Sequence, residues 1–169
     1  MRTVRLSEEL EALLQTDAES KRTSLNALIT TILMRYAEWD RYADKFGVVT
    51  LSADLFRALL ESIGETELEG TANDFGARLP NEAMLFWFKK ADLDAFLRYL
   101  SLNSQYGNLG EYELEVDGRN HRISIRHDYG ENWSKFLRVF LGSVLEKSLG
   151  LAPRFRVTRN GVLVTFATP

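Results

Sequence analysis

The fold of the first part of this chain is decided by the stretch Lys21-Arg22-Thr23-Ser24-Leu25-Asn26-Ala27-Leu28-Ile29. This stretch predicts the start of a helix, because the Ser24 side chain can accept a hydrogen bond from a backbone N–H that lacks a partner in the first helical turn. Apolar residues then recur at the three-and-four spacing of a buried helical face: Leu25, Leu28, Ile29, Ile32, Leu33 and Tyr36. Further apolar residues extend this face to Phe46, and Gly47 is a suitable helix stop.

A short strand and a shorter helix are predicted ahead of this stretch. The alternation in residues 3–6 places Thr3 and Arg5 on one face of the strand and Val4 and Leu6 on the other. The helix after it can be capped by Ser7, and its inward positions are Leu10, Leu13 and Leu14. A strand of about five residues with two short helices cannot bury a core alone, so we expect two copies of the chain to share one.

Three pieces of this region follow a known order: Met1-Arg-Thr-Val-Arg-Leu-Ser-Glu-Glu-Leu, Ala-Leu-Leu, and Arg-Thr-Ser-Leu-Asn-Ala-Leu-Ile. They resemble the ribbon-helix-helix family of DNA-binding dimers, over about the first quarter of the chain. The resemblance implies that strands from two chains pair into an antiparallel ribbon in the major groove, with the N-termini of the second helices holding phosphates on either side. The family usually has Gly in the turn between the helices. Here Lys21 would take that place, at a modest conformational cost.

The resemblance also predicts which residues contact DNA. Arg5 can hold guanine O6 and N7 with two hydrogen bonds, and Thr3 can bond a base edge or touch a thymine methyl. Backbone N–H groups at the start of the second helix would hold phosphates. The expected DNA-binding residues are Arg2, Thr3, Arg5, Arg22, Thr23, Ser24, Leu25 and Asn26. An ordinary edge strand with solvent-facing Thr3 and Arg5 is the alternative interpretation.

We expect residues 1–46 to form this ribbon-helix-helix domain and residues 47–169 to form a second domain, so that the whole chain belongs to the α+β class. In the second domain, residues 48–51 predict a short strand or an extended entry. Helices are predicted from Ser52 to Gly64, from Glu65 to a stop at Pro80, and over residues 92–99.

Two hairpins are predicted from tight-turn signals, with an amphipathic helix from Trp133 to Leu149 between them. The first turn, Asp117-Gly118, pairs Leu114 with His121 and places Glu113 opposite Arg122. For the second turn, Asn160-Gly161, the predicted partners are Phe155 with Phe166 and Val157 with Val164. Hairpin, helix and hairpin together predict a four-stranded antiparallel sheet with helices packed on its apolar face.

The connection between the first hairpin and the helix is the richest in functional groups: Arg126-His127-Asp128-Tyr129-Gly130-Glu131-Asn132-Trp133-Ser134. Free N–H groups of a helix start, beside Gly, Arg and His, can receive an anion. An ordinary strand-to-helix turn has the same features, and we favour that interpretation. The candidate ligand residues in this corner (residues 126–134) are Arg126, His127, Asp128, Gly130 and Trp133. The pattern Arg-His-Asp-x-Gly-x-x-Trp-Ser also resembles uncharacterised archaeal proteins, which implies no function.

The sequence supports neither a metal site nor catalysis. His121 and His127 share one strand face and could bind a metal with Asp128, but Ile123 and Ile125 lie on the same face, which favours packing histidines. There is no cysteine, no Ser in a Gly-flanked elbow and no phosphate-binding Gly-rich loop. We therefore expect no catalytic residues, no metal and no cofactor.

The overall expectation is a cytoplasmic, DNA-binding transcriptional regulator that acts as a homodimer or a tetramer on double-stranded DNA. The net charge of −3 does not itself indicate nucleic-acid binding, so affinity should be modest and salt-dependent. No apolar run reaches the roughly 18 residues that cross a bilayer, so no membrane partner is expected. The second domain would sense a small-molecule or anionic effector, or set the oligomer. The alternative is a dimeric interaction or ligand-binding module without DNA binding, and the well-patterned second domain argues against a toxin-neutralising regulator.

Overall fold

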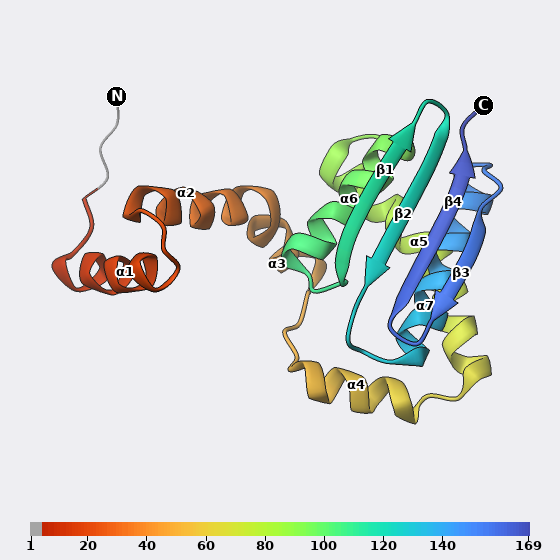
Figure 1. Cartoon of the computed structure of the whole chain (residues 1–169), viewed down its shortest axis with the longest axis horizontal. Helices are drawn as coiled ribbons and strands as arrows, with labels where there is room; N and C mark the ends of the chain where they lie inside the picture. Colours follow the sequence, from red (N-terminus) through yellow and green to blue (C-terminus); the bar gives the residue numbers. More distant parts are fainter. Residues whose placement is uncertain (1–4) are drawn as a thin grey trace. The chain divides into compact units, whose positions relative to one another are not determined.

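The protein is described from a computed structural model that covers residues 5–169. The chain divides into two compact units, residues 1–48 and residues 49–169 (Figure 1). We call them the N-terminal unit and the C-terminal unit. The division falls close to the boundary that the sequence predicts after residue 46.

The N-terminal unit is helical over most of its described length. Its elements are α1 (Glu8–Ser20), α2 (Leu25–Arg35), the π-helical turn η1 (Tyr36–Asp40) and α3 (Arg41–Phe46). Ser7 caps α1 by accepting a hydrogen bond from Leu10 N at 3.4 Å, and Ser24 caps α2 by accepting from Ala27 N at 3.2 Å. The last three elements follow one another without a break until Gly47, whose φ of 66° ends the helix.

The residues that the structure describes contain no N-terminal β-ribbon. Arg2, Thr3 and Val4 lie outside them, and Arg5 and Leu6 lead into α1 without a strand partner. The expected strand is therefore absent from the part of it that is described. A ribbon of the predicted kind takes its hydrogen bonds from a second chain, and a few extended residues without that partner have nothing to pair with.

The turn between α1 and α2 differs from the prediction by one residue. Lys21 keeps a negative φ of −87°, and Arg22 takes the left-handed conformation at 52°. The reason is that Lys21 N still donates to Asp17 O, so the helix pattern includes Lys21 and the chain reverses one residue later. Thr23 N then donates to Ala18 O at 2.9 Å and closes the turn.

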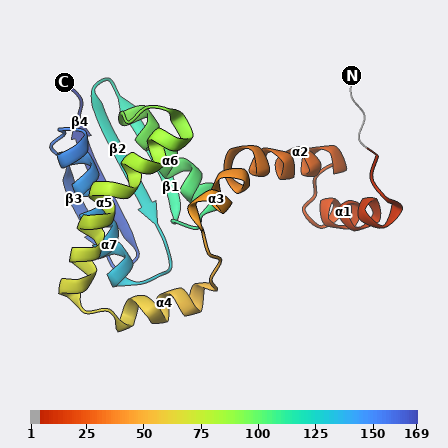
Figure 2. The same cartoon turned by 180° about the vertical axis from the view of Figure 1, so that it is seen from behind.

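The C-terminal unit is an α+β structure with a four-stranded antiparallel sheet, as the sequence predicts, and its strands lie in the order β1-β2-β4-β3. Figures 1 and 2 show α5, α6 and α7 on one face of this sheet, whereas the other face is open. The elements are α4 (Ala53–Ser62), α5 (Glu65–Phe88), α6 (Leu93–Tyr106), β1 (Glu111–Asp117), β2 (Asn120–Arg126), α7 (Glu131–Gly142), η2 (Ser143–Ser148), β3 (Arg154–Thr158) and β4 (Gly161–Ala167).

The core of this unit lies between the helices and the inner face of the sheet. Ile123, Ile125 and Val164 project from that face and are fully buried. They pack with buried side chains of α6, α7 and η2, which are Phe96, Leu100, Leu137, Leu141, Val144 and Leu145. Gly76 lets α5 approach α7 closely, because a Cβ there would lie 2.8 Å from the Phe140 carbonyl oxygen.

The predicted stop of α5 at Pro80 was wrong, whereas residues 48–51 agree with the extended entry that was one of the two predictions for them. α5 does not stop at Pro80 but continues to Phe88, and Met84 in its last turns is fully buried. Residues 48–52 form a connection without strand partners. No helix among residues 5–169 is both long and apolar enough to span a bilayer.

Both hairpin registers differ from the prediction by two residues. Leu114 pairs with Ile123 rather than His121, because Gly118, with φ 56°, is the first residue of its turn and not the second. Phe155 pairs with Val164 rather than Phe166, and Val157 with Val162. A shift of two residues keeps every side chain on its predicted face, so the predicted faces were right while the predicted partners, Glu113 with Arg122 among them, were wrong.

Candidate functional site

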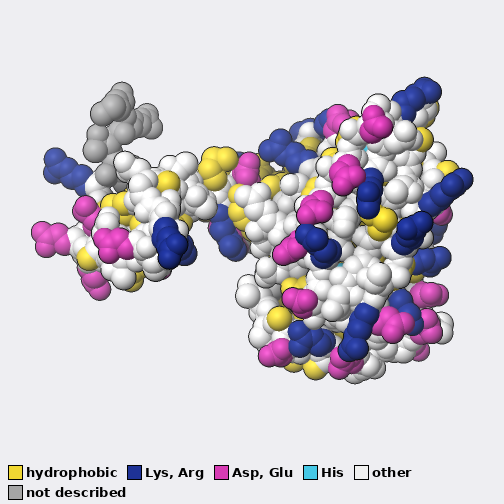
Figure 3. Space-filling view, in the orientation of Figure 1, with side chains coloured by type: hydrophobic (Ala, Val, Ile, Leu, Met, Phe, Trp, Pro, Cys, Tyr) yellow, Lys and Arg dark blue, Asp and Glu magenta, His cyan; other side chains and the backbone are white. Residues whose placement is uncertain are grey.

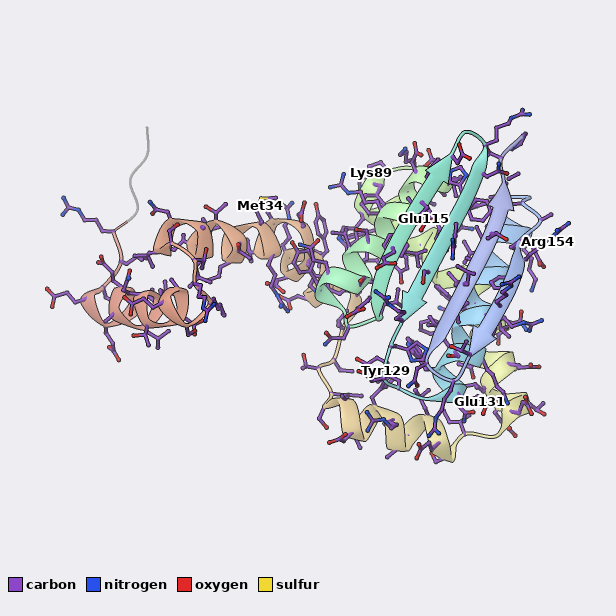
Figure 4. All side chains as sticks on the ribbon, in the orientation of Figure 1. Met34, Lys89, Glu115, Tyr129, Glu131 and Arg154 are labelled. Carbon is purple, nitrogen blue, oxygen red and sulfur yellow. The ribbon has the colours of Figure 1, made fainter. Side chains whose placement is uncertain are left out.

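The corner of residues 126–134 is held against the turn between β3 and β4. His127 N donates to Asn160 O at 3.0 Å, and Gly130 N donates to Asn160 Oδ1 at 3.2 Å. Gly130 has a φ of 86°, which favours glycine, and it precedes α7 without any side-chain cap. In Figure 4 the labels Tyr129 and Glu131 mark the residues on either side of this glycine.

His127 and Ser134 form the buried polar centre of the corner. His127 Nδ1 accepts a hydrogen bond from Tyr129 N at 3.2 Å, so the ring proton lies on Nε2. Nε2 donates to Ser134 Oγ at 2.9 Å. The Ser134 hydroxyl also accepts from Gly161 N and donates to Arg159 O, each at 3.1 Å. One serine thus links β2, α7 and the β3–β4 turn.

The direction of these hydrogen bonds decides what the pair can do chemically. In a nucleophilic serine the neighbouring imidazole accepts the hydroxyl proton. Here the imidazole is the donor, and the serine proton is directed at a backbone carbonyl. The two residues therefore act as a structural link and not as a nucleophile with its base.

The charge state of His127 follows from its surroundings. Burial lowers the pKa of His127 below its ordinary value, and the Asp128 carboxylate opposes this to a smaller extent. The Tyr129 N–H, which points at Nδ1, is also a donor that a protonated ring could not accept. The imidazole is accordingly neutral at neutral pH.

An open groove of about 820 Å³ lies beside the corner. Arg126, His127 and Asp128 line it, whereas Gly130 and Trp133 do not. Trp133 is packed instead, with its ring 5.0 Å from the Phe136 ring and 5.1 Å from the Phe56 ring, and its Nε1 donates to Leu109 O. The structure thus places three of the five predicted ligand residues in the lining of one groove.

The groove is also lined by Arg57 and Ser104, which were not among the ligand candidates of the sequence analysis. They come from distant segments, and no local motif marks them. Arg57 donates from Nε and Nη2 to the Asp128 carbonyl at 3.1 and 3.0 Å, and from Nη1 to Asp54 at 2.9 Å.

The positive charges of the groove already have partners. Arg126 pairs with Glu113 at 2.8 Å and with Glu111 at 3.3 Å, and Arg57 is held as described above. An anion would have to displace these partners. The geometry supports the interpretation of the corner as an ordinary, well-fixed strand-to-helix turn.

The candidate DNA-binding residues that the structure describes gather at the start of α2 and just before α1. Arg22 and Thr23 are exposed in the connection, and Ser24 and Asn26 are exposed in the first turn of α2, whereas Leu25 is half-buried. Arg5 is exposed before α1. Arg2 and Thr3 lie outside the described residues.

The N-terminal unit leaves part of its predicted core exposed to solvent. In its described part only Ala18, Leu28, Trp39 and Ala43 are buried among the hydrophobic residues. Large apolar side chains on α1, α2 and η1 are exposed by 43–62%, namely Leu10, Leu13, Ile32, Leu33, Met34 and Tyr36. Figure 3 shows hydrophobic side chains at the surface of this unit, and Met34 is labelled on α2 in Figure 4.

Residues 5–169 contain no group of three or more His, Asp or Glu side chains that could hold a metal ion. No protein-family model matches the chain, and no curated protein matches it.

Replacing Ser134 by Ala should lower the free energy of unfolding by about 1–3 kcal/mol, because His127 Nε2–H and Gly161 N–H would lose their acceptor in a buried site. Denaturant unfolding monitored by tryptophan fluorescence measures the change. Ser124→Ala, on the open face of β2, is the control and should change stability by less than about 0.5 kcal/mol. Equal stability of the two variants would contradict the structural role of Ser134.

Acid should destabilise the protein through His127. The pKa of His127 is lower in the folded state than in the unfolded state. Its contribution to the free energy of unfolding is therefore complete above the ordinary histidine pKa and is lost as the pH falls through the lowered, folded-state pKa. Thermal unfolding between about pH 7.5 and pH 5 should therefore show a steeper loss for the parent than for His127→Gln. Identical slopes for the parent and His127→Gln would refute the assignment.

Proposed function

We propose that this chain is a homodimeric, sequence-specific DNA-binding regulator of the ribbon-helix-helix kind. In this proposal, residues 3–6 of two chains pair as an antiparallel ribbon in the major groove. Arg5 and Thr3 then contact base edges. The N-termini of the two α2 helices hold phosphates on either side, with Arg22 nearby.

The observation that carries the proposal is the exposed apolar face of the N-terminal unit. Leu13 and Leu33 are 62% and 60% exposed in the single chain, although both lie on the face that the helical spacing predicts to be buried. A soluble protein rarely leaves a contiguous set of large apolar side chains in water without a partner. A second copy of the same two helices is the partner that the sequence pattern predicts.

The start of α2 supports the DNA contact. Ser24 caps the helix, so its side chain satisfies the Ala27 N–H while the N-terminal end stays exposed to solvent. Arg22 is exposed next to it. An exposed helix N-terminus with an adjacent arginine suits a phosphate group.

The C-terminal unit would set the oligomer or respond to an effector. A small anionic effector that entered its groove of about 820 Å³ would have to displace the carboxylates that hold Arg126. A chain that dimerises but does not bind DNA would be the interaction module considered above.

Leu33→Glu should weaken the dimer by about ten- to a hundred-fold, because burying a leucine on association contributes about 1.5–3 kcal/mol. Sedimentation velocity over a dilution series measures the effect. Leu85→Glu is the matched control, since Leu85 on α5 is 52% exposed in the C-terminal unit. A parent protein that stays monomeric at every concentration would refute the dimer.

Arg5→Ala should lose sequence discrimination, worth about 1–3 kcal/mol, whereas Ser24→Ala should weaken binding to all sequences alike. Duplexes selected by the parent from a random pool, compared with unselected duplexes by fluorescence anisotropy, measure both effects.

The control for Ser24→Ala is Ser52→Ala. Ser52 caps α4 by accepting from Leu55 N at 3.3 Å, so its loss also removes a helix cap but should leave DNA affinity unchanged. Equal preference of Arg5→Ala and the parent for selected duplexes would remove the base-reading role.

A further inference from the structure

The open face of the sheet is polar, and its residues are arranged by strand. Residues that pair across an antiparallel sheet share a face, so Glu115, Arg122, Thr165 and Arg154 form one row across all four strands. Strand β1 contributes Glu111, Glu113, Glu115 and Asp117 to this face. In the view of Figure 3, acidic side chains gather over β1 and basic ones over β3.

The arginines on this face fall into two groups. Arg122 and Arg126 on β2 pair with the glutamates of β1 at 2.8–3.5 Å. Arg154 and Arg156 on β3 are exposed, and neither has an ion-pair partner among residues 5–169. Figure 4 labels Arg154 on β3 and Glu115 on the β1 side of the sheet. On the open face, the β1–β2 half of the sheet thus carries paired arginines and an excess of carboxylates, whereas the β3 half carries free positive charge.

Strand β4 lies between these two groups of arginines and carries no charge on the open face. Its outward residues are Gly161, Leu163, Thr165 and Ala167. Because neighbouring strands are about 4.8 Å apart, the arginines of β2 and β3 flank a floor about 9.6 Å across. We call this surface the arginine trough.

Each end of the arginine trough opens into a hollow. The hollow at one end, of about 530 Å³, is lined by Arg122, Arg154 and Thr165. The groove of about 820 Å³ at the other end is lined by Arg126, Thr158 and Gly161. An extended ligand could therefore lie along β4 from one end of the sheet to the other.

We propose that the arginine trough binds the phosphodiester backbone of double-stranded DNA. This inference rests on the proposed function, since the DNA is taken to be the same molecule that the N-terminal unit binds. The guanidinium fork matches phosphate oxygens, and Arg154 and Arg156 have no carboxylate to release first. The outward positions of the paired strands hold no aromatic ring, so the trough does not stack bases and would contact the backbone without reading sequence.

The acidic row on β1 helps to define the bound position. It repels a polyanion from the β1 side and confines it to β4 and β3. Arginines on an edge strand also discourage pairing between sheets, which is the purely structural explanation of the same residues. An acidic protein segment is the other macromolecule that could bind to the positive charges of Arg154 and Arg156. The experiment below distinguishes DNA binding from edge protection and from binding of an acidic protein segment.

The test uses the full chain and an unselected duplex of about 30 base pairs, with anisotropy measured between about 50 and 200 mM salt. Arg154→Gln/Arg156→Gln should reduce the slope of log K against log salt by about 1.8 for each chain engaged, because each lost phosphate contact contributes about 0.9. The charge-matched control is Arg78→Gln/Arg138→Gln. These two exposed arginines lie on α5 and α7, which cover the opposite face, and the control should keep the parent's slope. Unchanged melting temperatures show that both variants are folded.

A slope reduced in the Arg154/Arg156 variant alone supports the trough. Equal slopes for the two double variants overturn it and leave the edge-protection explanation, while the proposed function still stands if Arg5→Ala loses discrimination. A reduced slope without any effect of Arg5→Ala supports the trough and removes the proposed function. Poly-glutamate that displaces the duplex from the parent, and binds the Arg154/Arg156 variant less well, reassigns the surface to an acidic protein. A parent that binds no duplex overturns both.

Discussion

The C-terminal unit depends on the contact between the inner face of its sheet and the helices that cover it. Ile123, Ile125 and Val164 lose all their exposure to water there. Each such side chain contributes about 1.5–3 kcal/mol when it is fully buried. The close approach of α5 to α7 at Gly76 belongs to the same contact, because any side chain at that position would meet the Phe140 backbone.

The polar features of the unit follow from this constraint. Residues alternate along a strand, so the ones between the buried positions of β2 must face water, and they are Arg122, Ser124 and Arg126. The alternation also carries His127 inward just past the end of β2. A buried imidazole needs partners for both nitrogens, and Tyr129 N and Ser134 Oγ supply them. The structure of the corner therefore follows from the burial of the inner face of the sheet. The same alternation places the residues of the arginine trough on the outer face, where they are in contact with solvent.

The two units differ in how far a single chain can enclose their hydrophobic core. The C-terminal unit encloses a core of its own between its sheet and several helices of the same chain, although side chains such as Leu55 and Val116 stay exposed. The helices of the N-terminal unit have apolar residues at the spacing of a buried face, but residues such as Leu13 and Leu33 are mostly exposed. A pair of short helices is too small to enclose a core, and this size limit is the physical basis for proposing that a second copy completes it. If that pairing holds, two C-terminal units and two arginine troughs would be present in each assembly.

Local sequence signals determined a good part of this protein. The caps at Ser7, Ser24 and Ser52, the stop at Gly47, the α+β class and the faces of the strands all depend on residues within a few positions of one another, which is why they could be predicted. Tertiary structure decided the rest. Pro80 lies inside α5, whose last turns bury Met84. The hairpin registers differ by two residues from the predicted ones, although each strand residue keeps its predicted face. Arg57 reached the Asp128 carbonyl, and Arg154 came to lie across the sheet from Arg122, only through folding. Those contacts join residues far apart in the chain, and a sequence specifies them only through the packing of the whole unit.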